Sequence, residues 1–526
     1  MPEGGRWRKG AKVCACFWAK WRRRENAPAQ PAVVSRPRQF AAWSILKERK
    51  GLSLFLETTM ATLEMDFGQA HFGGCDLGHR ARSRCLVKIA NAIHRHPGDT
   101  LPHKLHAPKD YKAMVRLMNR PETTHAAVLA GHVQRTQELL RQAEGPVLIL
   151  HDTTELDYSG LGSIGELGSI GANLGRGYLC HNSLAYDLQQ QRVLGLAQQI
   201  LHPRKIVGRK EGTRRKRERR SRESRLWPNA VTAVGPAPAG RLWVHVADRG
   251  SDTFEHLAQH VCDGSAFVLR SLGRRKIQPG HDGLRPARTL RKYARALPVQ
   301  SSQTVVIGAR AKQAKEEATV GVAWSEVLVH PPHVRRGEYE KKPLPLWLVV
   351  VREERAPKGR QALEWILLTN VPVTTAAQAW ERVRWYECRW VIEEYHKAQK
   401  TGCAIERLQF SSAQALQPMI ALLSVVAVTL LNLRDASRNE AAAQRPATEY
   451  VARRYIEVLS AWRYPGREFQ AMTVREFYLA LARLGGHQNR KGDHPPGWVV
   501  LWRGWTDLQH MLDGAEAIGL EIRGQT

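Results

Sequence analysis

Hydrophobic positions recur along the first third of the chain in a helical pattern. In the segments 86–96, 111–119 and 125–143, apolar residues repeat at spacings of three and four. Such spacings place these residues on one face of a helix, and Pro or Gly residues separate the segments. The pattern therefore predicts a small helical domain over residues 66–145.

After Gly145 the pattern changes to short, continuous apolar runs. Runs of this kind are typical of strands that are buried on both faces of a sheet. They lie at 147–152, 184–202, 241–248 and 266–272. The helical spacing of 253–261 falls between the last two, which predicts a strand–helix–strand unit and an α/β core.

Residues 273–375 have a strand-rich pattern, interrupted by Gly, Pro and basic clusters. Helical patterns return from Thr374. The longest apolar run, 419–431, follows Pro418 and is shorter than the ~20 residues that span a bilayer. We therefore expect a buried core helix there.

The last helical segment, 498–512, places its apolar residues on one face. They are Leu501, Trp505, Leu508 and Leu512. This stripe predicts either a core face or a face that binds a partner.

The net charge of the chain limits the kinds of molecule that it is expected to bind. The chain has 526 residues and a net charge of +31, with Lys+Arg 80 and Asp+Glu 49. Such an excess usually faces a polyanion, so nucleic acid is the first candidate and an anionic membrane surface the second. The 8 cysteines include no CxxC pair, which argues against disulfide and zinc-ribbon folds. They indicate reduced thiols, and no signal peptide is apparent, so we expect a soluble cytoplasmic protein without a membrane segment.

Two stretches are unusually basic. Residues 1–59 carry 13 Lys/Arg against 4 Glu, which predicts either a weakly ordered basic extension or a misassigned start codon upstream of Met60 or Met65. Residues 204–225 carry 12 Lys/Arg against 3 Glu. That run is expected to be a mobile loop that follows DNA, or otherwise a solvated charged segment.

Three acidic residues are candidates for chemistry. Asp152 and Asp248 each end an apolar run, and open α/β sheets bind ligands beyond the carboxyl ends of their strands. An Asp in this position also commonly caps the next helix or begins a turn. The third is Glu393, which lies in the predicted helix 376–400.

On a continuous helix over 376–400, Tyr386, Arg389, Glu393 and Lys400 would share one stripe. The adjacent stripe, which would face the core, is formed by Trp385, Cys388, Ile392 and Tyr395. An exposed salt-bridge ladder is the alternative, but Arg389 precedes Glu393 in the weaker order for helix stabilisation. The first stripe is better explained by phosphate handling, in which Glu binds a metal and the other side chains contact phosphate oxygens.

Two Asp and one Glu suit two Mg²⁺ ions, which prefer oxygen ligands. Two metals ~3.5–4 Å apart can activate water and stabilise the leaving oxygen of a DNA phosphodiester. No Cys/His zinc set, Walker loop or dinucleotide fingerprint suggests another chemistry. His151, next to Asp152, is expected to be a packed core histidine.

These residues resemble a known family. The sequence YECRWVIEEYHKAQKTG (386–402) resembles the YREK signature of DDE transposases from bacterial insertion sequences, in the insertion-sequence-four group. HDTTELDYSG (151–160) and VADRGSDTFEHL (246–257) resemble the segments that carry the two Asp residues of that family. The tail at 482–509 resembles the dimerisation region of transposon-five-like members.

The resemblance implies a fold and an organisation. A ribonuclease-H-like catalytic core would occupy 146–440, with a β-strand-rich insertion at about 273–375. It would be flanked by a helical domain at 66–145 that binds DNA ends and a helical dimerisation domain at 441–526. The basic extension would occupy residues 1–65, of which residues 1–59 have no counterpart in the family pattern.

The resemblance also implies roles for individual residues. Asp152, Asp248 and Glu393 would be the catalytic, metal-binding triad for two Mg²⁺, with Mn²⁺ as a substitute. Tyr386, Arg389, Lys397 and Lys400 would bind the DNA backbone near the cleaved end. Trp365 would take the place of a flipped base during hairpin formation, or would otherwise be a sheet-core residue.

The expected function is cut-and-paste transposition by a homodimer that pairs two ends of double-stranded DNA, in a bacterial cytoplasm and associated with the nucleoid. Three alternatives remain open. The chain could be a non-catalytic DNA-binding repressor derived from a transposase, or a generic ribonuclease-H-like nuclease. An anionic-membrane binder fits the charge but leaves the three acids unexplained.

Overall fold

The chain folds as a mixed α/β protein, which confirms the predicted class. The computed structural model describes residues 66–95, 100–105, 107–171, 174–205, 222–280, 288–307, 316–332, 342–355, 362–438, 443–466, 471–490, 493 and 495–517. The described residues fall into two compact units. The large unit contains 66–247 and 388–517, and the small unit contains 248–387. The basic extension predicted for 1–65 lies outside the described residues.

The large unit begins with the predicted helices. They are α2 (Phe67–Phe72), α3 (Arg80–Arg95), α4 (Leu101–Lys104), α5 (Pro108–Met118) and α6 (His125–Gln142). Helix α6 starts where the Thr124 side chain accepts a hydrogen bond from the Ala127 amide at 3.1 Å, which caps the helix. Its buried face packs against strand β4 and helix α13, so the helical segment is fastened to the sheet of the same unit.

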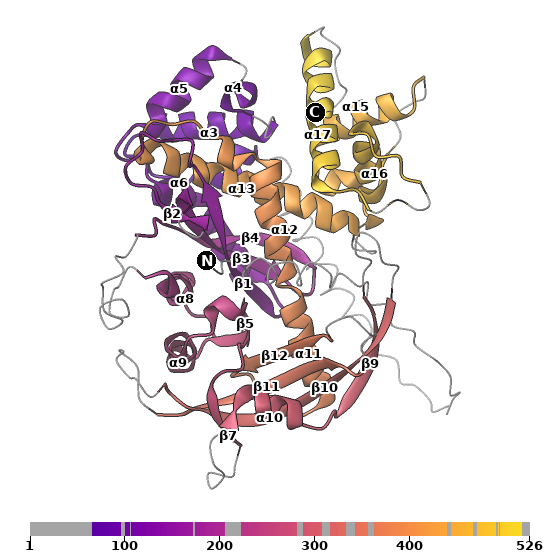
Figure 1. Cartoon of the computed structure of the whole chain (residues 1–526). Helices are drawn as coiled ribbons and strands as arrows, with labels where there is room; N and C mark the ends of the chain where they lie inside the picture. Colours follow the sequence, from indigo (N-terminus) through magenta and orange to yellow (C-terminus); the bar gives the residue numbers. More distant parts are fainter. Residues whose placement is uncertain are drawn as a thin grey trace, which may run out of the picture. The chain divides into compact units, whose positions relative to one another are not determined.

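The sheet of the large unit is mixed (Figure 1). It contains β1 (Val147–Asp157), β2 (Gly168–Ile170), β3 (Gly175–Asp187), β4 (Arg192–His202) and β5 (Trp243–Ala247). Strand β1 pairs antiparallel with β3 and parallel with β5, and β3 pairs antiparallel with β4 and β2. The turn η3 (Glu223–Arg225) and the helix α8 (Leu226–Val234) lie between β4 and β5 in the chain.

Strand β1 is longer than the apolar run that predicted it. The run ends at Asp152, but pairing with β3 continues to Asp157, which lies opposite Gly177. The apolar run marks only the part of β1 that is fully buried, because Asp152–Glu155 are partly exposed. Asp152 therefore lies inside the strand, at the point where its burial changes.

The small unit is rich in strands, as predicted for 273–375. Strand β12 pairs antiparallel with both β6 and β11, β10 pairs with β11, β9 and β7, and β8 pairs with β7. Its elements are η4 (Arg249–Ser251), α9 (Phe254–Asp263), β6 (Ala266–Arg270), β7 (Lys276–Pro279), β8 (Arg288–Thr289), α10 (Leu290–Ala296), β9 (Ser301–Ile307), β10 (Glu316–Val329), β11 (Leu344–Glu353), β12 (Glu364–Thr369) and α11 (Ala376–Glu387).

The continuous helix predicted over 376–400 is wrong. Helix α11 ends at Glu387, and α12 (Trp390–Lys397) begins after a break at Cys388 and Arg389. At this break the amides of Val391 and Ile392 bond to carbonyls three residues back, as in a tightened turn. The break coincides with the boundary between the two units, so tertiary packing overrides the helical pattern.

Helix α12 continues into a π-helical turn, Ala398–Gly402, which also shifts the helical register. Tyr386 therefore belongs to α11, Arg389 to the break, Glu393 to the first turn of α12, and Lys400 to the π turn. The single stripe predicted for these four residues does not form on one helix. The core-facing stripe is largely correct, because Trp385, Ile392 and Tyr395 are buried.

Helix α13 (Ala413–Arg438) contains the long apolar run, and its residues from 419 to 431 are buried or nearly so, as predicted for a core helix. Among the described residues, its segment Ala413–Asn432 is the one stretch long and apolar enough to cross a membrane. Because 83% of its most apolar window is buried inside the protein, it is consistent with the core of a soluble protein.

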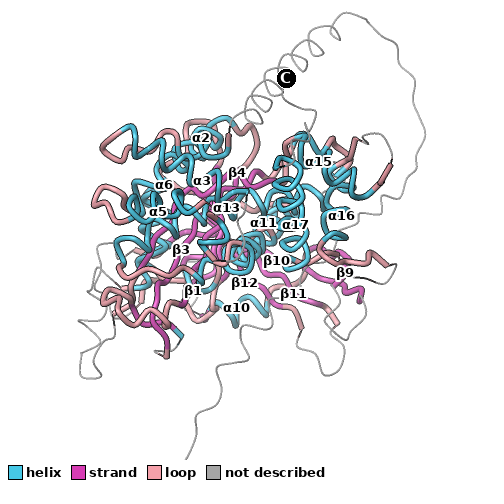
Figure 2. The backbone as a smooth tube through the Cα atoms, turned by 90° about the horizontal axis from the view of Figure 1, so that it is seen from above, coloured by secondary structure: helices cyan, strands magenta, loops and turns pink. Residues whose placement is uncertain are grey.

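The chain ends in a group of helices, α15 (Arg453–Arg463), α16 (Val474–Leu484) and α17 (Trp498–Ala517), which lie together in Figure 2. The short turns η6 (Ile405–Arg407) and η7 (Ala447–Glu449) precede α13 and α15. The stripe predicted in 498–512 is buried in the cores of this helical group. Of the two interpretations of that stripe, the core face is confirmed.

Candidate active site

Asp152 lies on β1 within the large unit, directly opposite Asn182 of β3. One carboxylate oxygen, Oδ1, accepts a hydrogen bond from the Thr153 amide at 2.8 Å. The other, Oδ2, accepts one from Arg389 Nη1 at 3.0 Å. The side chain is 19% exposed, so the carboxylate is partly shielded from water.

Arg389 joins two of the three predicted acids. While Nη1 bonds to Asp152, Nη2 donates to Oε1 of Glu393, one turn further along the chain. Arg389 itself is only 9% exposed, and Glu393 is 28% exposed. Residues 237 and 4 positions away in sequence thus meet at one guanidinium group.

The two carboxylates compete for this single positive charge. Burial raises the pKa of Asp152 above its ordinary value, although the Arg389 guanidinium acts in the opposite direction. Burial likewise raises the pKa of Glu393, and the nearby Asp152 carboxylate raises it further against the effect of Arg389. Two carboxylates that share one counter-ion are under-compensated, and a further cation would stabilise them.

Asp248 belongs to the small unit, directly after β5. Its side chain accepts a hydrogen bond from the Gly250 amide at 2.8 Å and caps the turn η4. Four residues on, Asp252 fixes the same turn to the end of β6 through hydrogen bonds from Ser271 Oγ and the Leu272 amide, both at 2.8 Å. Asp248 therefore caps a turn, which was one of the two roles expected from the sequence, and the hydrogen bonds of Asp252 hold this turn in place.

The residues fit a divalent cation in part. Asp152 and Glu393 supply carboxylate oxygens, the donors that Mg²⁺ prefers. Among the residues that the structure describes, no group of three or more His, Cys, Asp or Glu side chains comes together as a ligand set. Asp248 lies in the other unit, so the three-acid site remains a prediction.

Two predicted DNA-binding residues pack together in the small unit. The ring of Trp365, on β12, meets that of Tyr386, on α11, edge to face with centroids 5.1 Å apart. The Arg270 guanidinium lies 5.9 Å from the Trp365 ring centre. Trp365 is 9% exposed and Tyr386 is buried, which is the packing of a sheet-core tryptophan. Its expected contact with DNA remains a prediction.

The two predicted lysines have carboxylate partners in the large unit. Lys397 donates to Glu394 Oε1 at 2.6 Å, and its ammonium group lies 5.2 Å from the Trp390 ring centre. Lys400 lies 3.1 Å from Glu406 Oε1. Both lysines are at least partly exposed, so their charges are accessible from solvent. Whether they bind phosphate remains a prediction.

A buried cluster that the sequence pattern does not predict lies beside the site. Glu394 Oε2 accepts hydrogen bonds from Arg434 Nη1 and, at 3.0 Å, from Trp498 Nε1. Although burial acts to raise it, the pKa of Glu394 is lowered to about 2 by Arg434, Lys397 and Trp498. Nothing in the sequence pattern indicated which of the adjacent glutamates, Glu393 or Glu394, faces inward.

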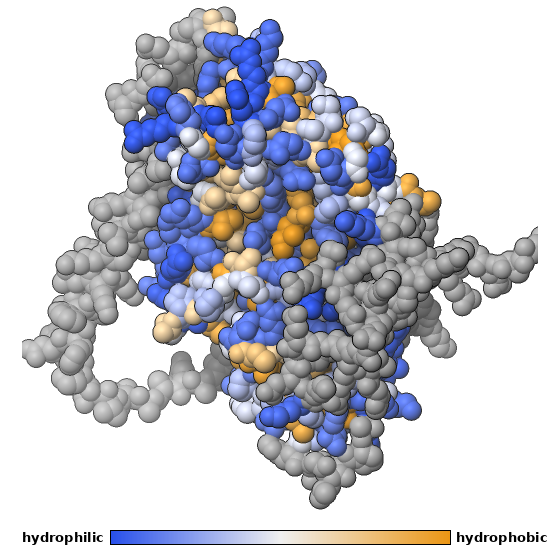
Figure 3. Space-filling view, turned by 90° about the vertical axis from the view of Figure 1, so that its left-hand side faces the viewer, coloured by the Kyte–Doolittle hydropathy of each residue, from blue (hydrophilic) through white to orange (hydrophobic). Residues whose placement is uncertain are grey.

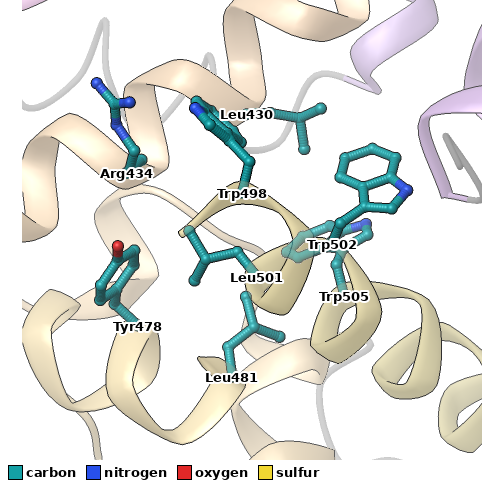
Figure 4. Close-up of a pocket in the computed structure, with 8 residues that line it drawn as sticks. All are labelled: Leu430, Arg434, Tyr478, Leu481, Trp498, Leu501, Trp502 and Trp505. Atoms are coloured by element: carbon teal, nitrogen blue, oxygen red, sulfur yellow. The ribbon is translucent and has the colours of Figure 1, made fainter. Parts of the chain in front are cut away.

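Arg434 and Trp498 of this cluster also line a small apolar pocket between α13, α16 and α17 (Figure 4). The other lining residues are Leu430, Tyr478, Leu481, Leu501, Trp502 and Trp505. The Arg434 guanidinium lies 5.0 Å from the centre of the Trp498 ring, so the aromatic face covers the buried charge.

The hydrophilic surface is consistent with the high charge of the chain. On the face shown in Figure 3, hydrophobic residues form small, separate patches among hydrophilic ones. Most of the basic run at 204–225 lies outside the described residues. Within the described part, Arg204 pairs with Glu223 at 2.9 Å. No family model matches this chain.

Proposed function

We propose that this protein is a DDE transposase that binds terminal inverted repeats and performs metal-dependent cut-and-paste cleavage and strand transfer in a dimeric synaptic complex. The observation that carries the proposal is the meeting of Asp152 and Glu393 at Arg389. Two acids from distant segments, with raised pKa values and one shared counter-ion, form the kind of site that receives a cation.

The parallel pairing of β1 with β5 supports the assignment of Asp248 as the third acid of the proposed site. In the parallel pair of β1 and β5, His151 lies beside Ala247. Asp152 follows the first of these residues and Asp248 follows the second. The proposal places the two aspartates at equivalent positions of neighbouring strands, as expected for a ribonuclease-H-like core.

Asp152, Asp248 and Glu393 would hold two Mg²⁺ ions, or Mn²⁺ in their place. When bound, such ions activate water and neutralise charge on the leaving oxygen. The protein groups act around them: the Arg389 guanidinium can pair with a phosphate oxygen as well as with a carboxylate. Tyr386, Lys397 and Lys400 would contact the DNA backbone, and Trp365 would occupy the place of a displaced base.

The net charge of +31 supports a nucleic-acid substrate. The helical segment α2–α6 would bind the DNA ends, and the C-terminal helices would support a homodimer. Because Leu501, Trp505, Leu508 and Leu512 are buried within the chain, dimerisation would use other parts of this helical group. Val499, at 50% exposure, is one residue of α17 that remains available.

The decisive experiment replaces Asp152 by Asn. The substrate is a duplex carrying the DNA that flanks the coding sequence on each side, incubated with the full chain and Mg²⁺. We expect Asp152→Asn to abolish cleavage while a gel shift still shows binding. Asp263→Asn, at the exposed end of α9, is the matched control and should cleave normally.

Retained cleavage by Asp152→Asn would overturn the proposal. Binding without cleavage by the unaltered protein would instead favour a DNA-binding repressor. Equal cleavage of unrelated duplexes would favour a generic nuclease.

A further inference from the structure

A series of buried and partly buried hydrogen bonds runs through the large unit beside the candidate active site. His125 Nε2, on α6, lies 2.9 Å from Gln199 Oε1, on β4. Gln199 Nε2 donates to Asn182 Oδ1, on β3, at 2.7 Å. Asn182 Nδ2 lies 3.1 Å from His396 Nε2, on α12. Four side chains on four elements are thus connected without a gap.

The donor and the acceptor of each hydrogen bond in this series can be assigned. Gln199 Nε2 also donates to Ser424 Oγ at 2.9 Å, so its amide nitrogen faces both acceptors and its oxygen faces His125. His125 must then donate through Nε2, and Asn182, whose oxygen is already an acceptor, must donate to His396. The lone pair of His396 Nε2 accepts that bond, which requires a neutral imidazole with its proton on Nδ1.

The environment of His396 keeps the ring neutral. Burial lowers the pKa of His396 to about 3, and the positive charges of Lys400 and Arg389 act in the same direction. The hydrogen bond from Asn182 is therefore available at any pH near neutrality.

The last bond of the series joins the two segments that carry the acids. Asn182 lies directly opposite Asp152 in the β1–β3 ladder, so both side chains point to the same face of the sheet. His396 lies three residues after Glu393, on the same side of α12. The Asn182–His396 bond thus fixes α12 over the face of β1 and β3 on which Asp152 and Arg389 meet.

We infer that Asn182 and His396 are positioning residues, which set the distance between the Asp152 strand and the Glu393 helix. The inference rests on the function proposed above. Gln199 holds the Asn182 amide in the orientation that His396 requires, and His125 extends this constraint to α6. A displacement of about 1 Å at a catalytic group can cost roughly 10²-fold in rate, so a bond of this kind affects the reaction without contacting the substrate.

The test compares three variants of the full chain. His396→Ala removes the acceptor and leaves the Asn182 amide unpaired in the core. His396→Gln supplies a side-chain oxygen near the place of Nε2 and should restore the bond. Asn432→Ala is the matched control, because Asn432, on α13, also joins two elements of the same unit, through hydrogen bonds with Val193 of β4 at 3.0 and 2.9 Å.

Three measurements are made: thermal unfolding, Mn²⁺ binding by calorimetry without DNA, and single-turnover cleavage of the flanking-DNA duplex. We expect both alanine variants to melt at lower temperature. Only His396→Ala should cleave about 10²-fold more slowly and bind Mn²⁺ more weakly, and His396→Gln should recover most of both. DNA binding in a gel shift should be unchanged in all three.

Wild-type cleavage and Mn²⁺ binding by His396→Ala, with only a lowered melting temperature, would overturn the inference. The same result for His396→Ala and Asn432→Ala would also overturn it, because a general loss of stability would then explain both. Failure of the proposed function is recognised separately, by cleavage that survives Asp152→Asn.

Discussion

Two adjacent glutamates on α12 have opposite electrostatic environments. Glu393 shares Arg389 with Asp152, is 28% exposed and has a raised pKa, caused by burial and by the neighbouring carboxylate. Glu394 is 11% exposed and accepts bonds from Arg434, Lys397 and Trp498, so that its pKa is lowered to about 2 despite burial. Both have an arginine partner, yet the consequences differ.

The difference is in the ratio of negative to positive groups. Around Glu394, two cations and an indole N–H face one carboxylate, which is a fully satisfied buried ion pair. Around Arg389, two carboxylates bond to one cation, and Lys397, which bonds to Glu394, acts on Glu393 only through its charge. An arginine–glutamate contact therefore has a structural role in the first case, whereas in the second it leaves negative charge that the cation of the proposed function would neutralise.

The largest expected effect comes from Glu393→Gln. If Glu393 binds metal as proposed, losing its carboxylate should remove several kcal/mol of transition-state stabilisation, which corresponds to roughly 10³-fold slower cleavage. Stability should change by less than about 1 kcal/mol, because Arg389 keeps Asp152 as a partner. Cleavage assays and urea unfolding of the same preparation measure both quantities. A large loss of stability with little loss of rate would reverse our assignment of the two glutamates.

Glu394→Gln should have the opposite profile. It leaves the Arg434 charge, which is 1% exposed, without a full counter-charge, and breaking a buried ion pair costs about 3–5 kcal/mol. Below the lowered melting temperature, cleavage should stay within several-fold of the wild type. The double variant Glu394→Gln/Arg434→Met should regain much of the lost stability, as measured by urea unfolding. If the double variant is no more stable than the single one, the pairing does not explain the loss.

Much of the fold was predictable from sequence, because the apolar runs and helical spacings that gave β1, β5, β6, α6 and α9 are local signals. The break at Cys388 and Arg389 was not, since it depends on the boundary between two compact units. The structure brings Asp152 and Glu393 to one guanidinium group, and their role as metal ligands stays a prediction. The actual link, Arg389, was expected to bind phosphate and was not expected to join the two acids.

Buried polar residues were the hardest to assign. Arg434 is 40 residues from its partner Glu394, and no local pattern marks it as buried. The sequence did contain a signal for Asn182, because a polar residue in the middle of the buried strand β3 needs a hydrogen-bond partner in the core. Its partner His396 could be found only from the structure, since the two are 214 residues apart in sequence.

Two histidines of the helical segment before β1 predict how the stability of the large unit depends on pH. Burial lowers the pKa of His132 to about 3 and that of His94 to about 4, in the helical segment before β1. The unfolded chain binds protons near pH 6.5 and the folded chain does not, so stability should fall as the pH decreases below 6.5. The slope is up to about 1.4 kcal/mol per pH unit for each histidine.

His132→Gln should make this dependence weaker between pH 6.5 and 5, because Gln retains an acceptor for the Leu196 amide and does not titrate. Urea unfolding at several pH values measures the slope. An unchanged slope would mean that other groups dominate acid sensitivity. The effects of Glu393→Gln and Glu394→Gln should then be compared above pH 6.5, where the histidines do not contribute.

The smallest expected effect concerns one hydrogen bond to Glu394. Trp498→Phe keeps an aromatic ring beside Arg434 but removes the Nε1 donor, which should cost about 1 kcal/mol. Trp505→Phe is the control, because Trp505 lies on the same helix, lines the same pocket in Figure 4, and has a buried Nε1 without a hydrogen-bond partner among the described residues. Both substitutions remove similar volume, so the difference between their free energies of unfolding isolates the bond. Equal values would show that the indole contributes to the Glu394 cluster by packing alone, and the satisfied state of Glu394 would then rest on its two cations.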